Sequence, residues 1–391
     1  MNLPAISFAY LRARPLATAL NLLLLALGVA TITVLLLATT RLEERMGRDA
    51  RGIDLVAGAK GSPMQLVLSA VYHLDAPTGN IPLADAQALS RSQAIRKAIQ
   101  LALGDSYRGY RIVGTSHEYT AHYGAALAAG RLWGAPMEAV AGAEVAANSG
   151  LAVGAIFTGA HGLSDGGDQH EQEPFNVVGV LARSGSVLDR LILTSVESVW
   201  EIHEHAGASE RKEITALLIQ YATPLAAATM PRQVNASGSL QAASPAYESA
   251  RLFRMIGVGV EVLRAFGIVL ILAAGLSVFI ALLNALEERR YDLAVMRMLG
   301  AGRGRLMGLM LIEGTALAAA GGVAGLALGH VLTEALGLAL GRAGQAAVTG
   351  WVWDAREFWV LGLALLVGFC AALLPAWRAY RSEVAPVLAQ G

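Results

Sequence analysis

The sequence predicts an α-helical membrane protein with four transmembrane helices and a large α/β extracytoplasmic domain between the first and second of them. Three observations predict this fold class. The chain is 55% hydrophobic and only 15% charged, with a mean hydropathy of +0.50, which is too apolar for an ordinary soluble protein. Four apolar runs approach or exceed the roughly 20 residues that cross a hydrocarbon core. Residues 41–264, between the first two runs, are numerous and polar enough to bury a core of their own.

The first predicted span covers residues 16–40, which contain no charged side chain. Arg12 and Arg14 precede it within residues 1–15, so the positive-inside rule places the amino terminus in the cytoplasm. A cleaved signal peptide is the alternative interpretation. A transmembrane helix is favoured because the run exceeds the roughly 7 to 15 apolar residues of a signal core and no clean A-x-A site follows it.

Residues 41–264 are predicted to form the extracytoplasmic domain, because the chain has crossed the membrane once before them. Strand-like pieces alternate with short helical ones between residues 110 and 203, which is typical of mixed α/β structure. Residues 230–249 are rich in Pro, Ser, Gln and Ala and are interpreted as a linker or hairpin. Helical patterns at residues 41–49 and 247–264 adjoin the first two spans, and together they predict a two-helix stalk.

Composition argues against nucleotides and nucleic acids as direct ligands. The segment GAKGS at residues 58–62 lacks the G-x-x-x-x-G-K-[ST] spacing that surrounds phosphates, so it is interpreted as a turn, and no cofactor is expected to bind directly. The formal net charge is +0, without a basic stripe for nucleic acid. The single cysteine, Cys370, lies in the last apolar run, which leaves no intramolecular disulfide and no thiolate metal site.

One loop of the extracytoplasmic domain, residues 159–174, is rich in Gly, Asp, His and Glu. A solvated loop is the favoured interpretation. The alternative is a divalent metal site, because imidazole and carboxylate groups are common metal ligands. No H-E-x-x-H motif is present, since Gln172, Glu173 and Pro174 follow His170–Glu171. The candidate ligands are His161, Asp165, Asp168, His170 and Glu171, with His203 and His205 as a second histidine pair.

A charged segment, residues 287–305, follows the second predicted span at residues 265–286. Its apolar side chains recur at roughly helical spacing and its charged side chains take other faces, which predicts an amphipathic helix that ends at Gly300 and Gly302. The apolar set is Leu293, Met296, Met298 and Leu299, and the charged set is Arg289, Arg290, Asp292 and Arg297. Between two spans, this helix either rests on lipid or docks into a groove on a cytoplasmic partner.

The third predicted span, residues 306–331, carries glycine at every fourth position from Gly321 through Gly325 to Gly329. Small residues at this spacing let two helix backbones approach closely in lipid. Glu313 is interpreted as an interfacial residue, snorkelling or paired with an arginine such as Arg305, in preference to a carboxylate on an ion path.

The last part of the chain is predicted to return to the cytoplasm. A short periplasmic loop covers residues 332–357, where Trp351 and Trp353 are expected to anchor at the interface. Residues 358–377 form the fourth predicted span. Residues 378–391, with Arg378 and Arg381, are then a cytoplasmic tail.

These residues resemble the MacB/FtsX-type permeases of ABC transporters. The resemblance rests on one span, a large outer domain and three further spans, on EERRYDLAVMRMLGAGRGRL at residues 287–306, and on LLPAWRAYRSEVAPVL at residues 373–388. In the outer domain it rests on GIDLVAGAKGS, AALAAGRLW and FNVVGVLA. It covers nearly the whole chain, and the segment at 287–306 is its most specific part.

The resemblance implies a non-catalytic permease subunit in the bacterial inner membrane, with both termini in the cytoplasm. Its expected partners are a second permease copy, two copies of a cytoplasmic ABC ATPase that bind ATP and Mg, the lipid bilayer, and a periplasmic or outer-membrane protein. Residues 287–305 would dock into the ATPase and pass its movement to the outer domain, a mechanism called mechanotransmission. The implied docking residues are Glu288, Arg289, Arg290, Asp292, Leu293, Val295, Met296, Arg297, Leu299 and Gly300.

Transport, extraction of lipoproteins and other work on the cell envelope all remain open within this resemblance. A membrane-anchored binding, metal-handling or signalling protein without ATP coupling is the alternative of another class. A membrane metallohydrolase is a third, disfavoured because the H-E-x-x-H motif is missing.

Overall fold

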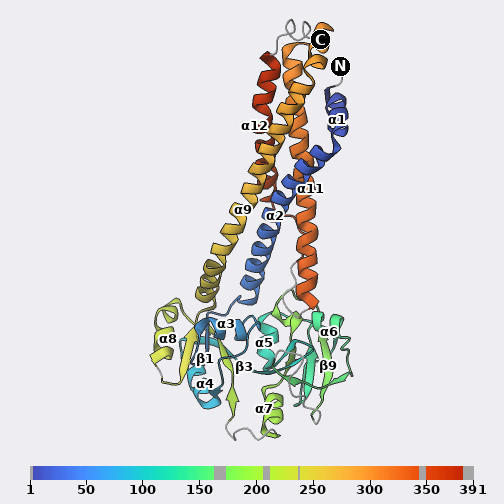
Figure 1. Cartoon of the computed structure of the whole chain (residues 1–391). Helices are drawn as coiled ribbons and strands as arrows, with labels where there is room; N and C mark the ends of the chain where they lie inside the picture. The colour runs from blue at the N-terminus through green and yellow to red at the C-terminus, as the bar shows by residue number, and fades with distance from the viewer. Residues whose placement is uncertain (1–2, 163–172, 206–211, 237, 343–348, 382–391) are drawn as a thin grey trace. The chain divides into compact units, whose positions relative to one another are not determined.

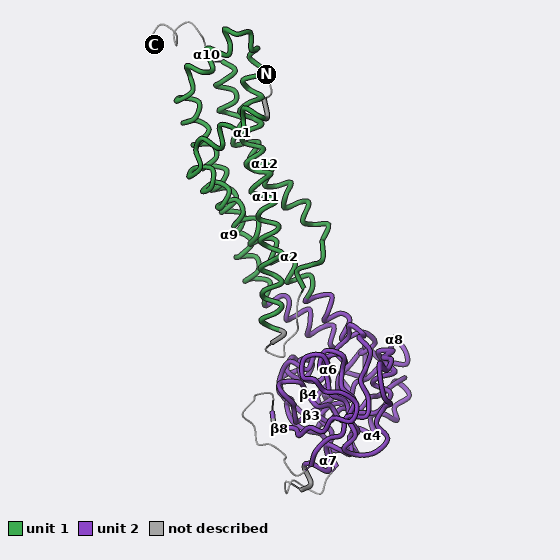
Figure 2. Tube along the Cα trace, turned by 90° about the vertical axis from the view of Figure 1, so that its right-hand side faces the viewer, with its two compact units in different colours: residues 1–41, 256–340, 347–391 green, residues 42–255, 341–346 purple. Residues whose placement is uncertain are grey.

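A computed structural model of the chain describes residues 3–162, 173–205, 212–236, 238–342 and 349–381. Figure 1 labels its helices and strands. The chain divides into two compact units, shown in different colours in Figure 2. The membrane unit comprises residues 1–41, 256–340 and 347–391, and the α/β unit comprises residues 42–255 with 341–346.

The membrane unit contains six helices among the described residues: α1 (Leu3–Ala13), α2 (Pro15–Asp49), α9 (Pro245–Glu288), α10 (Arg290–Met298), α11 (Arg303–Arg342) and α12 (Glu357–Arg381). By length and composition, α2, α9, α11 and α12 can each cross a membrane. The predicted class of four transmembrane helices with an α/β domain between the first and second is therefore confirmed. Both α2 and α9 contain residues of each unit.

Helix α11 is longer than the span that the sequence predicted. It continues past Val331 to Arg342, so the first part of the predicted loop at 332–357 is helical. The reason is local composition, because residues 332–340 consist mostly of Leu and Ala, which favour helix, and contain no proline.

The glycines of α11 lie against α2 within the membrane unit. A Cβ atom added to Gly325 would lie 2.6 Å from the Cβ of Val29, and one added to Gly329 would lie 2.7 Å from the Cβ of Thr33. Gly321 faces Leu25 in the same way. The missing side chains let the two helix backbones approach, which gives close van der Waals packing in lipid.

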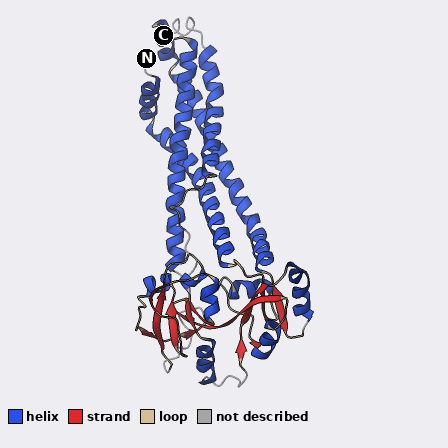
Figure 3. Cartoon of the chain, turned by 180° about the vertical axis from the view of Figure 1, so that it is seen from behind, coloured by secondary structure: helices blue, strands red, loops and turns tan. Residues whose placement is uncertain are grey.

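The α/β unit holds the short elements. Its helices are α3 (Pro63–Ala70), α4 (Leu83–Ser90), α5 (His117–His122), α6 (Ala143–Ser149), the 3-10 helix η1 (Val187–Arg190), α7 (Val196–His205) and α8 (Pro224–Ala236). Its strands are β1 (Leu55–Ala59), β2 (Ile81–Pro82), β3 (Ile95–Tyr107), β4 (Tyr110–Thr115), β5 (Leu127–Gly130), β6 (Glu138–Ala141), β7 (Ile156–Phe157), β8 (Ala160–His161), β9 (Phe175–Leu181), β10 (Ile192–Thr194), β11 (Glu213–Ile214), β12 (Ala216–Tyr221) and β13 (Leu240–Ala243). Figure 3 shows these strands in red.

Most strands of the α/β unit join one mixed sheet. Its order is β13-β1-β12-β3-β4-β10-β6-β9-β5, with β7 paired to β9 and β8 paired to β3. The pairs β4–β10 and β6–β9 are parallel. Strand β4 is buried throughout, and strand residues such as Leu101, Leu217 and Phe175 belong to buried apolar clusters. Strands that are buried on both faces of a sheet typically have continuous apolar sequences.

Two local predictions in the α/β unit have different outcomes. Residues 58–62 form a turn only in part, because Gly58 and Ala59 end strand β1. The residues after them lead into α3, which Ser62 caps by accepting a hydrogen bond from the N–H of Gln65. The interpretation of residues 230–249 as a linker or hairpin was wrong. This stretch contains the end of α8, strand β13 and the start of α9, and β13 pairs with β1 from the other end of the domain sequence.

Candidate coupling site on the membrane unit

The segment between α9 and α11 forms the short helix α10 in the membrane unit. Helix α9 ends at Glu288 and α10 covers Arg290–Met298. Gly300 follows with a φ of 94°, in the left-handed region that favours glycine, and α11 begins at Arg303. The predicted amphipathic helix and its glycine stop are both present at residues 287–305.

One face of α10 is buried inside the membrane unit. Leu293 is only 2% exposed and belongs to an apolar cluster that draws on α9, α11 and α12. Ile6 and Tyr10 of α1 pack against the same cluster. The complete cluster is Leu286, Leu293, Leu306, Leu309, Met310, Ala376 and Ala379. This packing fixes α10 to the ends of its neighbours.

A buried ion pair strengthens the attachment. The Nη1 atom of Arg289 lies 3.3 Å from a carboxylate oxygen of Glu313, and both side chains are less than one-tenth exposed. The guanidinium carbon of Arg289 also lies 3.7 Å from the ring centre of Tyr10, a cation–π geometry. Glu313 is thus paired, as one of the sequence interpretations had it, but with Arg289 instead of Arg305.

A second ion pair lies where α1, α2 and α9 approach one another. Arg14 contacts Glu288, the last residue of α9. Arg290 contacts Glu287 on the exposed side at 2.8 Å. Arginines therefore hold both sides of the junction between α9 and α10, the buried side through Arg289 and the exposed side through Arg290.

The other face of α10 is open. Leu299 is 82% exposed, Met298 63% and Tyr291 57%, and Asp292 and Arg290 are exposed beside them. Val295, Met296 and Arg297 are half-buried. The structure thus divides the residues implied to dock: Leu293 and Arg289 face the interior of this chain, whereas Leu299, Arg290, Asp292 and Glu288 face outward. Tyr291 was missed by the sequence analysis, although it lies one helical turn before Val295.

The candidate metal ligands fall largely outside the described residues. Asp165, Asp168 and His170 belong to residues 163–172, as does Glu171. The backbone of His161 lies in β8, which pairs with β3. Within the described ranges, no group of three or more His, Cys, Asp or Glu side chains is arranged to hold a metal ion. Metal binding by this loop stays a prediction.

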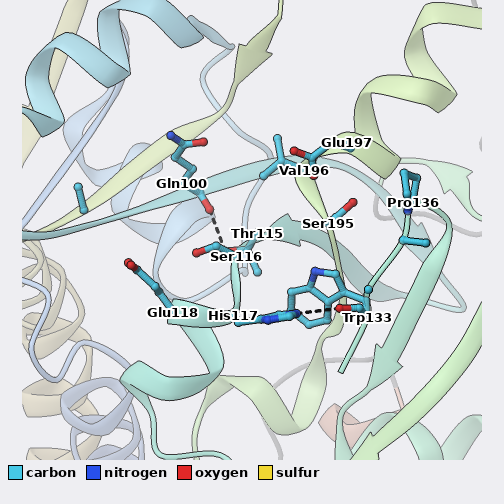
Figure 4. Close-up of a pocket in the computed structure, with 13 residues that line it drawn as sticks. Gln100, Thr115, Ser116, His117, Glu118, Trp133, Pro136, Ser195, Val196 and Glu197 are labelled. Atoms are coloured by element: carbon cyan, nitrogen blue, oxygen red, sulfur yellow. Dashed lines mark hydrogen bonds between the residues drawn. The ribbon is translucent and has the colours of Figure 1, made fainter. Parts of the chain in front are cut away.

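A groove of about 590 Å³ opens in the α/β unit. It lies where β4 and β10, neighbouring parallel strands, end and pass into α5 and α7. In α/β sheets, ligand sites often form at the carboxyl ends of parallel strands. The lining residues include His117, Glu118, Trp133 and Glu197, of which Glu118 and Glu197 come from different helices (Figure 4). The remaining lining residues are Ala98, Gln100, Thr115, Ser116, Gly134, Ala135, Pro136, Ser195 and Val196.

One wall of this groove is held in place by hydrogen bonds. Glu138 pairs with Arg131 and also accepts hydrogen bonds from the N–H groups of Gly134 and Ala135. The bond from Arg131 is the main reason that the pKa of Glu138 is lowered to about 2. The loop that presents Trp133 is therefore tied at both ends.

The ionisable side chains that line the groove are one histidine and two glutamates. The ring of His117 meets the carbonyl oxygen of Trp133 at 2.8 Å through Nε2 (Figure 4). Because a carbonyl only accepts, Nε2 carries the hydrogen and Nδ1 of a neutral ring is an acceptor. Glu118 and Glu197 add two carboxylates, and no lysine or arginine is among the lining residues. The groove suits a ligand group that donates hydrogen bonds or carries positive charge.

Comparison with known families agrees with this architecture. Four helices that can each cross a membrane, with a large α/β domain inserted between the first two, are the architecture of a multi-pass membrane protein. Residues 18–237 match the MacB-like periplasmic core domain and residues 264–384 match the FtsX-like permease C-terminal domain. The chain belongs to the MacB/FtsX family of ABC transporter permeases and is a multi-pass inner-membrane protein.

Individual relatives are more distant. A Macrolide export ATP-binding/permease protein MacB of Nitrobacter winogradskyi is 30% identical over 129 residues, which are 33% of this chain and 19% of that protein. The periplasmic region of MacB from Actinobacillus actinomycetemcomitans is 15% identical, with a TM-score of 0.35 over 52% of this chain and 95% of that one. The extracellular domain of the noncanonic ABC-type transporter YknZ from Gram-positive bacteria is 11% identical, with a TM-score of 0.31 over 48% and 98%.

Proposed function

We propose that this chain is the membrane subunit of an ATP-driven transporter of the mechanotransmission type. In this proposal, a cytoplasmic ABC ATPase docks on the exposed face of α10 and a second permease copy completes a dimer that binds two ATPase copies. ATP and Mg bind to the ATPase. The permease itself performs no chemistry and converts ATPase movement into movement of its α/β unit, for export or for work on lipoproteins and the envelope.

The observation that supports this proposal most directly is the exposed apolar surface at the end of α10. Leu299, Met298 and Tyr291 are each more than half exposed, although the opposite face of the same helix is buried. Burying one such side chain in a partner groove contributes about 1.5 to 3 kcal/mol. Arg290 and Asp292 flank this surface, and their charges can select the orientation of the partner.

The attachment of α10 allows movement to be passed on. Because Leu293 and the Arg289–Glu313 pair fix α10 to its neighbours, a partner that displaces α10 also displaces the ends of α9 and α11. Helix α9 is continuous from Pro245 to Glu288, so the displacement reaches residues that belong to the α/β unit. A helix without a proline or a break in its interior transmits force along its axis.

In the proposed orientation, α10 and both termini lie in the cytoplasm. Arg12, Arg14, Arg378 and Arg381 flank the first and last spans on the same side as α10, in agreement with the positive-inside rule. The α/β unit is then periplasmic, where it can meet a periplasmic or outer-membrane partner.

The groove between β4 and β10 is a candidate recognition site for the substrate or for that partner. Its two carboxylates and the absence of lining lysines and arginines favour a group with positive charge. A binding role for the α/β unit without ATP coupling is the alternative function, and the groove is equally compatible with it.

The test is affinity purification of the full chain from its native membrane in mild detergent, followed by identification of associated proteins and an ATPase assay. Two variants distinguish the faces of α10. Leu299→Asp should release the ATPase without lowering the stability of the permease, because this side chain packs against little of its own chain. An ATPase that stays bound to the Leu299→Asp variant would contradict docking at this surface. A permease that purifies alone would favour the alternative.

A further inference from the structure

Helix α1 packs one of its faces against the membrane unit and leaves the other uncovered. Ser7 is 2% exposed, and its hydroxyl donates a hydrogen bond to the carbonyl oxygen of Leu309 at 3.4 Å. Ile6 and Tyr10, on the same side of α1, pack against the apolar cluster that also contains Leu293 of α10. Four residues on the opposite side, which we call the open face of α1, are all exposed: Ala5, Phe8, Ala9 and Arg12. The proposed docking surface on α10 does not include this face.

The composition of the open face fits a membrane–water interface. The ring of Phe8 is 67% exposed, and the other uncharged residues of the face are alanines. A helix face in contact with water usually carries polar side chains. Phe8 and Arg12 are four residues apart, so the ring and the guanidinium are neighbours on the helix surface. An aromatic ring beside a cation is typical of helices that lie in the headgroup region of a bilayer.

The neighbouring part of the chain indicates where α1 lies relative to the lipid. Leu16, Leu20 and Leu23 are 84%, 53% and 54% exposed and share one face of α2, which can cross a membrane. Exposed apolar side chains on such a helix face the lipid. Just before them, Arg14 lies between α1 and α2 and contacts Glu288 at the end of α9. Because charged side chains are costly in the hydrocarbon core, this ion pair marks its edge, and α1 lies at the level of the headgroups.

Arg12 provides the open face with a charge that a lipid headgroup can bind. Among the described residues, no carboxylate pairs with Arg12, whereas Arg14 pairs with Glu288. A guanidinium donates two parallel hydrogen bonds to phosphate oxygens, which makes arginine well suited to phosphate recognition. A leaflet that contains anionic lipid also attracts arginines near its surface. The open face therefore matches an anionic lipid surface in both its apolar and its charged parts.

The inward face of α1 connects this lipid contact to α10. The guanidinium carbon of Arg289 lies 3.7 Å from the ring centre of Tyr10. Arg289 directly precedes α10 and also pairs with the buried carboxylate of Glu313. A displacement of α1 by the lipid therefore moves one of the supports of Arg289, at the junction between α9 and α10.

We propose that α1 binds an anionic lipid surface through Phe8 and Arg12, and that this contact sets the position of α10. Phe8 enters the boundary between headgroups and acyl chains, and Arg12 binds headgroup phosphate. In the orientation of the proposed function, on which the regulatory consequence rests, this surface is the cytoplasmic leaflet, and anionic lipid raises the activity of the coupled ATPase. The lipid contact itself requires no ATPase.

A nitroxide label on the open face measures the lipid contact in the full chain. Cys370→Ser removes the single native cysteine, and Ala9→Cys then carries the label between Phe8 and Arg12. Gly302→Cys is the matched control, because it lies in the turn between α10 and α11 with open space around it. In phosphatidylcholine nanodiscs with and without phosphatidylglycerol, collisions of the label with oxygen, which dissolves in lipid, are compared with those of a neutral nickel chelate, which stays in water. We expect oxygen collisions to dominate at Ala9→Cys and chelate collisions at Gly302→Cys.

Arg12→Gln is the discriminating variant, because it removes the charge from an exposed position and leaves the packed face of α1 intact. Phosphatidylglycerol should raise the ratio of oxygen to chelate collisions at Ala9→Cys. Arg12→Gln should lose this rise, and Arg12→Lys should keep it. The proposal is overturned by a label as open to chelate as the control, which would place the face in water, or by one closed to both reagents, which would place it against protein. A rise that persists in Arg12→Gln would overturn the headgroup contact.

The link to α10 is tested separately with the ATPase added. Phosphatidylglycerol should raise ATPase activity with the wild type and not with Arg12→Gln, and an equal response of both would refute the link. The label measurements involve no ATPase, so failure of the coupling proposal is separately visible.

Discussion

Removal of Arg289 should be among the most destabilising single changes in the membrane unit. Arg289→Met leaves the carboxylate of Glu313 buried without its partner, and loss of one member of a buried pair typically costs about 3 to 5 kcal/mol. The N–O separations of 3.3 and 3.5 Å exceed the roughly 2.7 to 2.9 Å of strong charge-assisted bonds. We therefore expect the lower end, a loss of about 3 kcal/mol in the free energy of unfolding.

The double variant is the decisive member of this series. Glu313→Leu alone should also destabilise, because it leaves the guanidinium of Arg289 buried beside Tyr10. Arg289→Met with Glu313→Leu replaces both charges by apolar groups of similar volume, and should lie within about 1 kcal/mol of the wild type. Denaturant unfolding of the full chain in detergent measures all four members of the cycle. Losses that simply add in the double variant would refute the pairing of these two charges.

Three further outcomes follow from the packing and the pKa shifts. Gly325→Ala should cost about 1 to 3 kcal/mol, because its Cβ would lie 2.6 Å from that of Val29. Gly362→Ala, with open space around it, should in the same unfolding assay be neutral or stabilise by up to about 1 kcal/mol. Burial keeps the pKa of His73 well below its usual value of about 6.5. Neutral His73 should therefore contribute its full stabilisation of the α/β unit above that pH, and the free energy of unfolding should fall by up to about 1.4 kcal/mol per pH unit below it. Hydrogen exchange should show this loss in the wild type. The His73→Asn variant should not show it, and asparagine tolerates the left-handed backbone at this position. Leu293→Ala should lower the stability of the membrane unit by about 2 to 5 kcal/mol, and a near-neutral result would contradict its burial.

The architecture could be predicted from the sequence because lipid imposes a simple rule. A run of apolar residues long enough to span the bilayer must form a helix that satisfies its own backbone hydrogen bonds. The four long helices follow from that rule. Helix α11 extends beyond the predicted span, because the Leu and Ala residues after Val331 continue a helix whether or not lipid surrounds them.

The faces of α10 could be predicted only in part. Helical period indicated that one side was apolar, but it could not show whether that side is covered by the chain itself or left for a partner. The structure assigns Leu293 to the first case and Leu299 to the second. The partner of Glu313 was misjudged for a related reason, because Arg289 is 24 residues away in sequence and meets it only through the turn at α10.

Long-range pairing explains the remaining failures. Strand β13 is short and contains Gln and Ala, which have little preference for strands, and it is fixed by its pairing with β1. Tyr10 and Arg289 come from distant parts of the sequence. Each has an ordinary position in its own segment, and only the folded end of the membrane unit brings them together.

The most direct test of the central claim is the ATPase activity that accompanies the purified permease, compared between the wild type and Leu299→Asp. The account predicts that a cytoplasmic ABC ATPase purifies with the wild type in a fixed ratio, and that Leu299→Asp loses it while the permease keeps its unfolding free energy. An unchanged, stoichiometric ATPase in the variant, or no ATPase with the wild type, would contradict coupling through α10.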